Sequence, residues 1–144
     1  MRTFLLLLCV INLAVGSAQA QSFDGNYAGK MACSLLSDLK RPLSVNFSMK
    51  VSGSEASYER EIVRPGTGSG PARTGNYERG NGTVSASGEV SLRGKGEGPF
   101  VFEGEYRGQL TGSTIQLTGS QHWQVRGTTE TRSCQIELTR PSSR

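Results

Sequence analysis

The sequence predicts an all-β domain that forms an eight-stranded antiparallel up-and-down barrel with one disulfide. Glycine makes up 19 of the 144 residues, about twice its usual share. Apolar and polar side chains alternate with a period of two along most of the chain, and only a pleated strand collects such a set on one face. Turn signals divide the chain into about eight strands. A two-sheet β-sandwich is the alternative, because alternation alone fits both architectures.

Residues 1–20 predict a secretory signal peptide that is removed on export. Arg2 precedes an apolar run from Phe4 to Val15, and Ala18-Gln19-Ala20 has the small residues of a cleavage site. Residues 21–144 then form a single β domain, which we expect in the periplasm or outside the cell. Losing Arg2 lowers the net charge from +4 to +3. No later apolar run approaches the roughly 20 residues of a membrane helix.

Each expected strand follows from its alternation and from the turns beside it. The expected ranges are 25–33, 43–51, 55–62, 74–79, 83–93, 99–110, 113–125 and 131–139. A Gly-x-Tyr triplet lies in the first, fourth and sixth strands. In the other strands the apolar residues occupy alternate positions, as in the run Val45, Phe47, Met49 and Val51. We call this set of alternate positions, which shares one face of a strand, the apolar parity. Short turns are expected at 52–54, 80–82 and 111–112, and Asn81-Gly82 is the strongest hairpin signal.

The two cysteines of the exported domain predict a structural disulfide between Cys33 and Cys134, because thiols pair in oxidising compartments. Cys33 ends the first expected strand and Cys134 lies in the last. In an even-numbered meander both would lie at the same end of the barrel, where the bond would staple the closing seam. Closing a loop of about 100 residues stabilises the folded state by roughly 4–5 kcal/mol in the chain-entropy model.

Five glycines on the apolar parity also favour a coiled barrel wall. They are Gly29, Gly88, Gly104, Gly108 and Gly119.

The longer connections are expected at 34–42, 63–73, 94–98 and 126–130, all at one end of the barrel. Binding sites concentrate on such loops and in barrel openings. This end has eight basic residues and three acidic ones, so it would attract an anionic ligand or surface. The alternative is that the loop arginines only keep the protein soluble. The expected rim residues are Arg64, Arg73, Arg93 and Arg126.

The expected pocket lining consists of Arg60, Tyr106 and Trp123. Arg60 and Gln121 are polar residues at inward parity, and a charge inside a barrel must be paired or must face a wet cavity. Either they line a pocket, or the expected register is shifted there. His122 is expected at the surface, and Glu103 with Glu105 is interpreted as a solvated outward pair.

No catalytic motif is present: the chain lacks a Gly-x-Ser-x-Gly elbow, a His-Glu-x-x-His helix and an acidic calcium loop. We expect no cofactor and no metal, and catalysis stays an unsupported alternative. Nucleic acid is not an expected partner, because the charge is modest and no RNA-reading motif occurs. The expected partner is a small molecule or a protein of anionic character.

Residues of about 99–139 resemble the late strands of avidin-type barrels. The resemblance rests on Gly104-Glu105-Tyr106-Arg107-Gly108, then Ile115, Trp123 and Gly127-Thr128-Thr129-Glu130. It implies a secreted eight-stranded barrel with Trp123 as a pocket wall. Those barrels bind biotin between several tryptophans, whereas Trp123 is the only tryptophan of this chain. The resemblance therefore implies the architecture and not a biotin site.

The expected function is that of an exported non-catalytic binding module with its site at the end formed by the longer loops. Two alternatives stay open. One is an integral outer-membrane barrel, in which the apolar parity would face lipid. The five glycines and Arg60 on that parity argue against this alternative. We therefore expect no membrane insertion. The other is a periplasmic inhibitor of another protein, with the basic loops as its contact surface.

Overall fold

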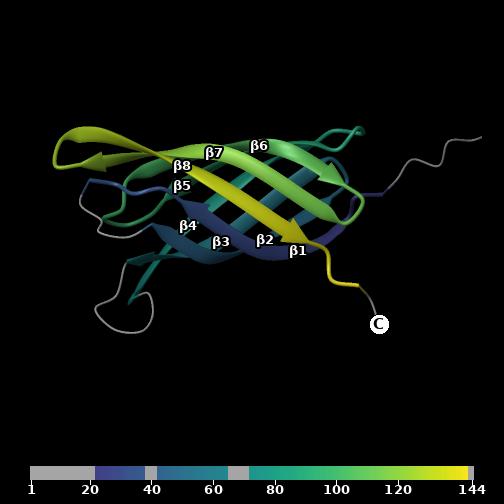
Figure 1. Ribbon diagram of the computed structural model, residues 1–144, viewed down its shortest axis with the longest axis horizontal. Coiled ribbons are helices and arrows are strands. Elements are labelled where there is room, and N and C mark those ends of the chain that lie inside the picture. The colour runs from purple at the N-terminus through teal and green to yellow at the C-terminus, as the bar shows by residue number, and fades with distance from the viewer. Residues whose placement is uncertain (1–21, 38–41, 65–71, 143–144) are drawn as a thin grey trace, which may run out of the picture.

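The protein is a closed eight-stranded antiparallel barrel in which each strand pairs with the next and the first pairs with the last (Figure 1). The computed structural model describes residues 22–37, 42–64 and 72–142. The expected signal peptide lies outside these residues. The strands are β1 (Gly25–Cys33), β2 (Leu43–Ser52), β3 (Glu55–Arg64), β4 (Ala72–Val84), β5 (Glu89–Gly96), β6 (Phe102–Thr111), β7 (Thr114–Val125) and β8 (Thr128–Thr139). The barrel prediction is confirmed, and the sandwich alternative is wrong because β1 and β8 close the sheet.

The apolar parity of the strands faces the barrel interior. In β2, every second residue from Leu43 to Val51 is buried and every residue between them is exposed. The outer wall has polar and charged side chains such as Lys30, Asn46 and Glu137. This orientation is opposite to the one that the outer-membrane alternative requires, in which apolar side chains face lipid. Within the described residues, no helix is long and apolar enough to cross a membrane.

Several inward glycines lie where neighbouring strands approach too closely for a side chain. A Cβ atom at Gly29 would lie 2.0 Å from the carbonyl oxygen of Glu137, and one at Gly119 would lie 1.9 Å from that of Glu105. Side chains in folded proteins do not make contacts this short, so the tight curvature of this wall requires glycine at these positions.

The prediction of a hairpin at Asn81-Gly82 is wrong, because β4 continues through both residues to Val84. Gly82 pairs with Ala56 on one side and with Leu92 on the other. The turn follows instead at residues 85–88, where the Ser85 hydroxyl accepts a 3.0 Å bond from the backbone N–H of Glu89. Pairing to both neighbours outweighs the local preference of Asn-Gly for a turn, and the expected strand 83–93 divides accordingly.

The connection between β7 and β8 is also shorter than expected. A two-residue turn of Arg126 and Gly127 replaces the expected loop 126–130, and both residues have positive φ, 48° and 83°. Two such residues suit the right-handed twist of a tight hairpin. The hairpin projects beyond the rest of the barrel in Figure 1.

Cys33 and Cys134 form the predicted disulfide, with a Cα–Cα distance of 4.0 Å. The two residues are direct partners in the β1–β8 register. The bond therefore spans the seam at which the first and last strands close the sheet, and both cysteines are buried.

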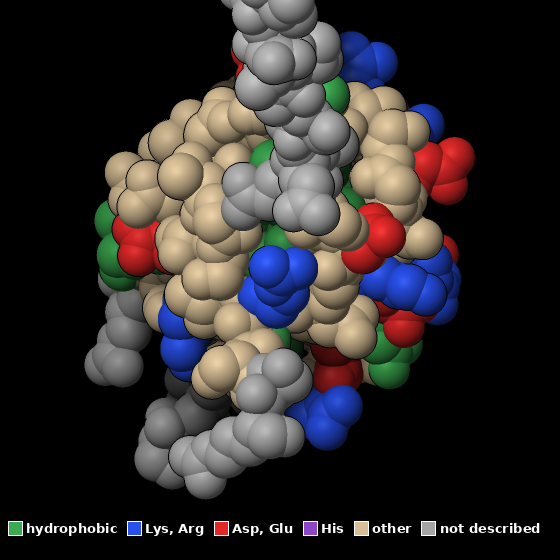
Figure 2. Space-filling view, turned by 90° about the vertical axis from the view of Figure 1, so that its right-hand side faces the viewer, with side chains coloured by type: hydrophobic (Ala, Val, Ile, Leu, Met, Phe, Trp, Pro, Cys, Tyr) green, Lys and Arg blue, Asp and Glu red, His purple; other side chains and the backbone are tan. Residues whose placement is uncertain are grey.

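The two ends of the barrel differ. The strand ends that flank residues 34–42, 65–71, 97–101 and 126–127 share one end of the barrel, which we call the long-loop end. The three short turns, at residues 53–54, 85–88 and 112–113, lie at the other end, together with the described residues before β1 and after β8 (Figure 1). Figure 2 looks onto that short-turn end, where the described surface shows hydrophobic side chains only in small separate patches. Arg140 lies across Tyr27 there and donates a 2.8 Å bond to the backbone carbonyl of Asp24.

Candidate functional site: a charged layer inside the barrel

The barrel interior changes character along its axis. A continuous apolar core of residues such as Tyr27, Phe47, Leu92 and Ile136 fills much of the interior. Towards the long-loop end lie buried polar and charged side chains, which we call the polar layer. It consists of Tyr58, Arg60, Glu78, Tyr106, Gln121 and Arg132.

The strand positions place this layer at a common depth. Arg60, Gln121 and Arg132 each lie four residues from the long-loop end of their own strand, which is roughly 13 Å of extended chain. Ile62 and Phe102 are buried apolar residues outside the main core. Because they lie closer to the strand ends than the charges do, a thin apolar level separates the polar layer from the long-loop end.

Glu78 is the centre of the polar layer and is completely buried. Its Oε1 atom accepts hydrogen bonds from the hydroxyls of Tyr58, at 2.7 Å, and Tyr106, at 2.9 Å. Its Oε2 atom forms an ion pair with Arg60 Nη2 at 2.5 Å. A buried carboxylate keeps its charge only with partners of this kind, so the four side chains form one unit.

Gln121 connects this unit to Arg132. Its amide nitrogen donates to the Tyr106 hydroxyl at 2.7 Å and, more weakly, to Glu78 Oε2 at 3.4 Å. Its amide oxygen accepts from Arg132 Nε at 2.8 Å and from Arg132 Nη2 at 2.6 Å. Trp123 Nε1 donates to the same oxygen at 3.1 Å. One neutral amide oxygen therefore holds the two-pronged donor of a buried arginine.

The polar layer has more positive than negative charge. The exposed fraction is 6% for Arg60, 4% for Arg132 and 0% for Glu78, so two buried cations face one buried carboxylate. Among the described residues Arg132 has no ion pair, and Arg60 Nε has no hydrogen-bond partner. An unpaired buried donor costs about 1–3 kcal/mol. The arrangement is thus one that an additional negative charge would stabilise.

Burial shifts the pKa values of three groups in the layer. It lowers the pKa of Arg132 to about 10, and the nearby charge of Arg60 adds to that effect. Burial also raises the pKa of the Tyr58 hydroxyl far above its ordinary value, with the Glu78 charge as the second cause. The pKa of Tyr106 is raised for the same two reasons. Both tyrosines therefore stay neutral donors at any physiological pH.

A row of glycines makes room for these side chains. Gly80, Gly94 and Gly104 are direct partners across β4, β5 and β6. A Cβ at Gly80 would lie 2.2 Å from the ring of Tyr58, and one at Gly104 would lie 2.7 Å from the Tyr106 hydroxyl. The glycines thus let the two phenols reach Glu78 across an interior that larger residues would fill.

The structure brings together all three residues that the sequence predicted as pocket lining. Arg60 and Tyr106 contact Glu78 directly. Trp123 is half-buried and stacks on Phe102, with ring centroids 4.0 Å apart, while the guanidinium of Arg132 lies 5.0 Å from the Trp123 ring centroid. The inward parity of Gln121 is also confirmed, so the expected register holds there.

The expected rim residues do not form one group. Arg64 lies over the ring of Phe100, and Arg73 forms an ion pair with Glu61 at 2.6 Å. Arg126 occupies the β7–β8 turn. The placement of Arg93 at the rim is wrong, since it points outward from the wall of β5. Lys40, Arg41 and Asp38, which also contributed to the expected basic end, lie outside the described residues.

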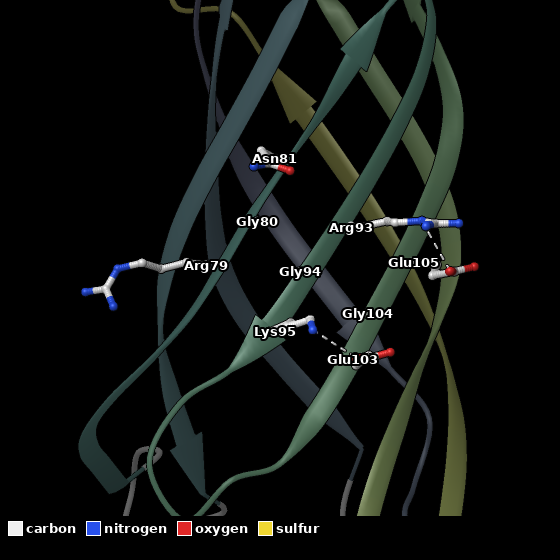
Figure 3. Close-up of a pocket in the computed structure, with 9 residues that line it drawn as sticks. All are labelled: Arg79, Gly80, Asn81, Arg93, Gly94, Lys95, Glu103, Gly104 and Glu105. Atoms are coloured by element: carbon white, nitrogen blue, oxygen red, sulfur yellow. Dashed lines mark ion pairs between the residues drawn. The ribbon is translucent and has the colours of Figure 1, made fainter.

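Arg93 borders a shallow hollow on the outer wall of β4, β5 and β6, with a volume of about 480 Å³ (Figure 3). The backbone of the glycine row forms its floor. Arg93 pairs with Glu105 at 3.4 Å and Lys95 pairs with Glu103 at 3.2 Å. Because these exposed charges pair across adjacent strands, the hollow does not share the charge imbalance of the interior.

Sequence reasoning missed three members of the layer, Tyr58, Glu78 and Arg132. Glu78 lies within the expected strand 74–79, but the residues around it show no apolar alternation from which its inward direction could be predicted. Arg132 lies in the expected strand 131–139 but was counted only among the charges of the loop end, although the alternation of Cys134, Ile136 and Leu138 leads back to it along β8. Extending that parity by one step would have found it.

Among the described residues, no three His, Cys, Asp or Glu side chains lie close enough to hold a metal ion. No protein-family model, no curated protein and no solved structure matches the chain. The resemblance to avidin-type barrels therefore stays a prediction beyond the eight-stranded architecture itself.

Proposed function

We propose that this protein is an exported, non-catalytic binding module that takes an anionic group of its ligand into the polar layer from the long-loop end. The observation that carries the proposal is the charge imbalance of that layer, in which Arg60 and Arg132 are buried with a single carboxylate, Glu78.

The energetic cost of the layer supports a role in binding. Burying an ion pair costs several kcal/mol per ion, and well-packed apolar residues in the same place are often equally or more stabilising. Much of the same barrel interior is filled with such residues. Arg132 is the second arginine and has no carboxylate partner among the described residues, so no ion pair offsets the free energy that its burial costs. We therefore expect its benefit in binding.

The location of the layer supports the same proposal. The glycine row and the two tyrosines hold Glu78 at the centre of the barrel, and the half-buried Trp123 borders both the layer and solvent. Arginine on a rigid strand is a preorganised anion receptor, because its planar fork needs little further ordering.

The test is a thermal-shift screen of the exported domain, residues 21–144, with small anionic, neutral and cationic compounds. A compound that binds only the folded state stabilises it by about 2.7 kcal/mol at a hundredfold excess over Kd. We expect anionic compounds alone to raise Tm, and the variant R132Q to lose that response. The matched control is R93Q, which removes an arginine from the outer wall. A response that is equal in R132Q and the wild type would contradict the proposed site.

A further inference from the structure

We infer that the group taken by the polar layer is a single carboxylate on an apolar body. This inference rests on the proposed function and narrows it to a ligand class. It follows from three separate observations: the size of the charge surplus, the geometry of the donors, and the apolar level above them.

The polar layer has a net charge of +1. Arg60 and Arg132 contribute two positive charges and Glu78 one negative charge, so a monoanion neutralises the layer. A phosphate monoester has a charge of about −1.5 to −2 at neutral pH and would leave the layer negative. Excess charge of either sign is costly in a buried site, and the layer therefore favours a carboxylate over a phosphate.

The donors of Arg132 have the geometry that a carboxylate uses. Its Nε and Nη2 atoms converge on Gln121 Oε1 at 2.8 and 2.6 Å. These two donors are able to bind the two oxygens of a carboxylate in parallel, an arrangement that is stronger than bonds to a neutral amide. The carboxylate would replace the amide oxygen of Gln121 on Arg132. The unpartnered Nε of Arg60 is a further donor in the same layer.

The apolar level favours an apolar body behind the carboxylate. Ile62 lies two residues closer to the long-loop end than Arg60, and Trp123 lies two residues closer than Gln121. Two large hydrophobic residues are exposed at the same end: Leu35, with an exposed fraction of 49%, and Val101, with 58%. A ligand whose headgroup reaches the layer would have its remaining atoms among these side chains, where apolar surface is buried favourably.

Arg132 allows the inference to be tested without loss of the fold. It has no ion pair among the described residues, so replacing it with glutamine leaves no carboxylate unpaired. Removing a buried, poorly compensated charge is often neutral or stabilising. Arg60 is a weaker probe, because its removal would leave Glu78 without a cation.

The experiment is a fluorescence titration of the exported domain, in which Trp123 is the only tryptophan and lies beside Arg132. The probes are octanoate, octanol, octyl phosphate and sodium formate. We expect octanoate to change the emission of Trp123 and to bind about tenfold or more tightly than octanol or octyl phosphate. Formate should bind more weakly than octanoate, because it lacks an apolar body. R132Q should lose about tenfold or more in octanoate affinity, and R93Q should bind as the wild type does.

The outcomes separate this inference from the proposed function. If octyl phosphate binds as tightly as octanoate and R132Q loses both, the carboxylate class is wrong and the anion site stands. If formate equals octanoate, the apolar body is wrong. If no probe changes the emission and no anion raises Tm, both the inference and the proposed function fail.

Discussion

The hydroxyl of Tyr58 occupies the space that a side chain at position 94 would need. A Cβ atom at Gly94 would lie 1.9 Å from Tyr58 Oη, and that hydroxyl donates a 2.7 Å hydrogen bond to Glu78. Gly94 on β5 therefore leaves room for the buried hydrogen bond between Tyr58 on β3 and Glu78 on β4.

Gly94→Ala should destabilise the barrel by about 1–3 kcal/mol, because overpacking forces the Tyr58 ring to move. Urea unfolding measures the change, and Thr118→Ala on the exposed face of β7 serves as the control. The double variant Tyr58→Phe with Gly94→Ala should lose less free energy of unfolding than the sum of the two single variants, because the oxygen that would clash with the alanine is then absent. Strict additivity would show that the Tyr58 hydroxyl does not occupy this space.

Glu78→Gln should destabilise the protein by about 3–5 kcal/mol, because it leaves Arg60 as an uncompensated buried charge. The double variant Arg60→Met with Glu78→Gln should recover much of that loss, since no unpaired charge of this ion pair is then buried. Chemical unfolding of the single and double variants forms a mutant cycle. A double variant no more stable than Glu78→Gln would argue against the ion pair as the origin of the effect.

Replacing Cys33 and Cys134 with serine should cost about 4–5 kcal/mol in the chain-entropy model, because the bond closes a loop with a sequence separation of 101 residues. Mass spectrometry without reductant checks that the bond forms in the exported domain. Unfolding of the double serine variant measures its contribution. Two free thiols in the exported protein would contradict the disulfide.

The contribution of Tyr58 and Tyr106 to stability should decline as the pH rises above about 10. The pKa values of Tyr58 and Tyr106 are raised in the folded state, so above the ordinary tyrosine pKa the unfolded state releases protons that the folded state retains. Their contribution to stability is complete below that pH and declines above it. Tyrosinate absorbance followed together with unfolding tests this prediction. Ionisation of both buried tyrosines while the barrel stays folded would contradict it, and Tyr58→Phe should weaken the pH dependence.

The alternation of side chains determined the architecture. Because parity assigns a face to each residue independently of its partners, it correctly placed the apolar set of β2 inside and predicted that Arg60 and Gln121 point inward. The pairing of Cys33 with Cys134 followed from the barrel closure and from the absence of another cysteine outside the expected signal peptide. These features depend on local pattern and on counting, and both are complete in the sequence.

The tertiary structure alone decided where strands end and which polar groups meet. Asn81-Gly82 has the local chemistry of a turn, yet pairing with β3 and β5 keeps it in β4. Arg60 and Glu78 are register partners on the consecutive strands β3 and β4, whereas Arg132 lies on β8, and only the register of the closed barrel brings all three into one layer. Parity states that a side chain faces the interior but not which other side chains it meets there. The charge surplus of the polar layer is therefore a property of the closed barrel, because it depends on contacts across the interior that no local pattern contains.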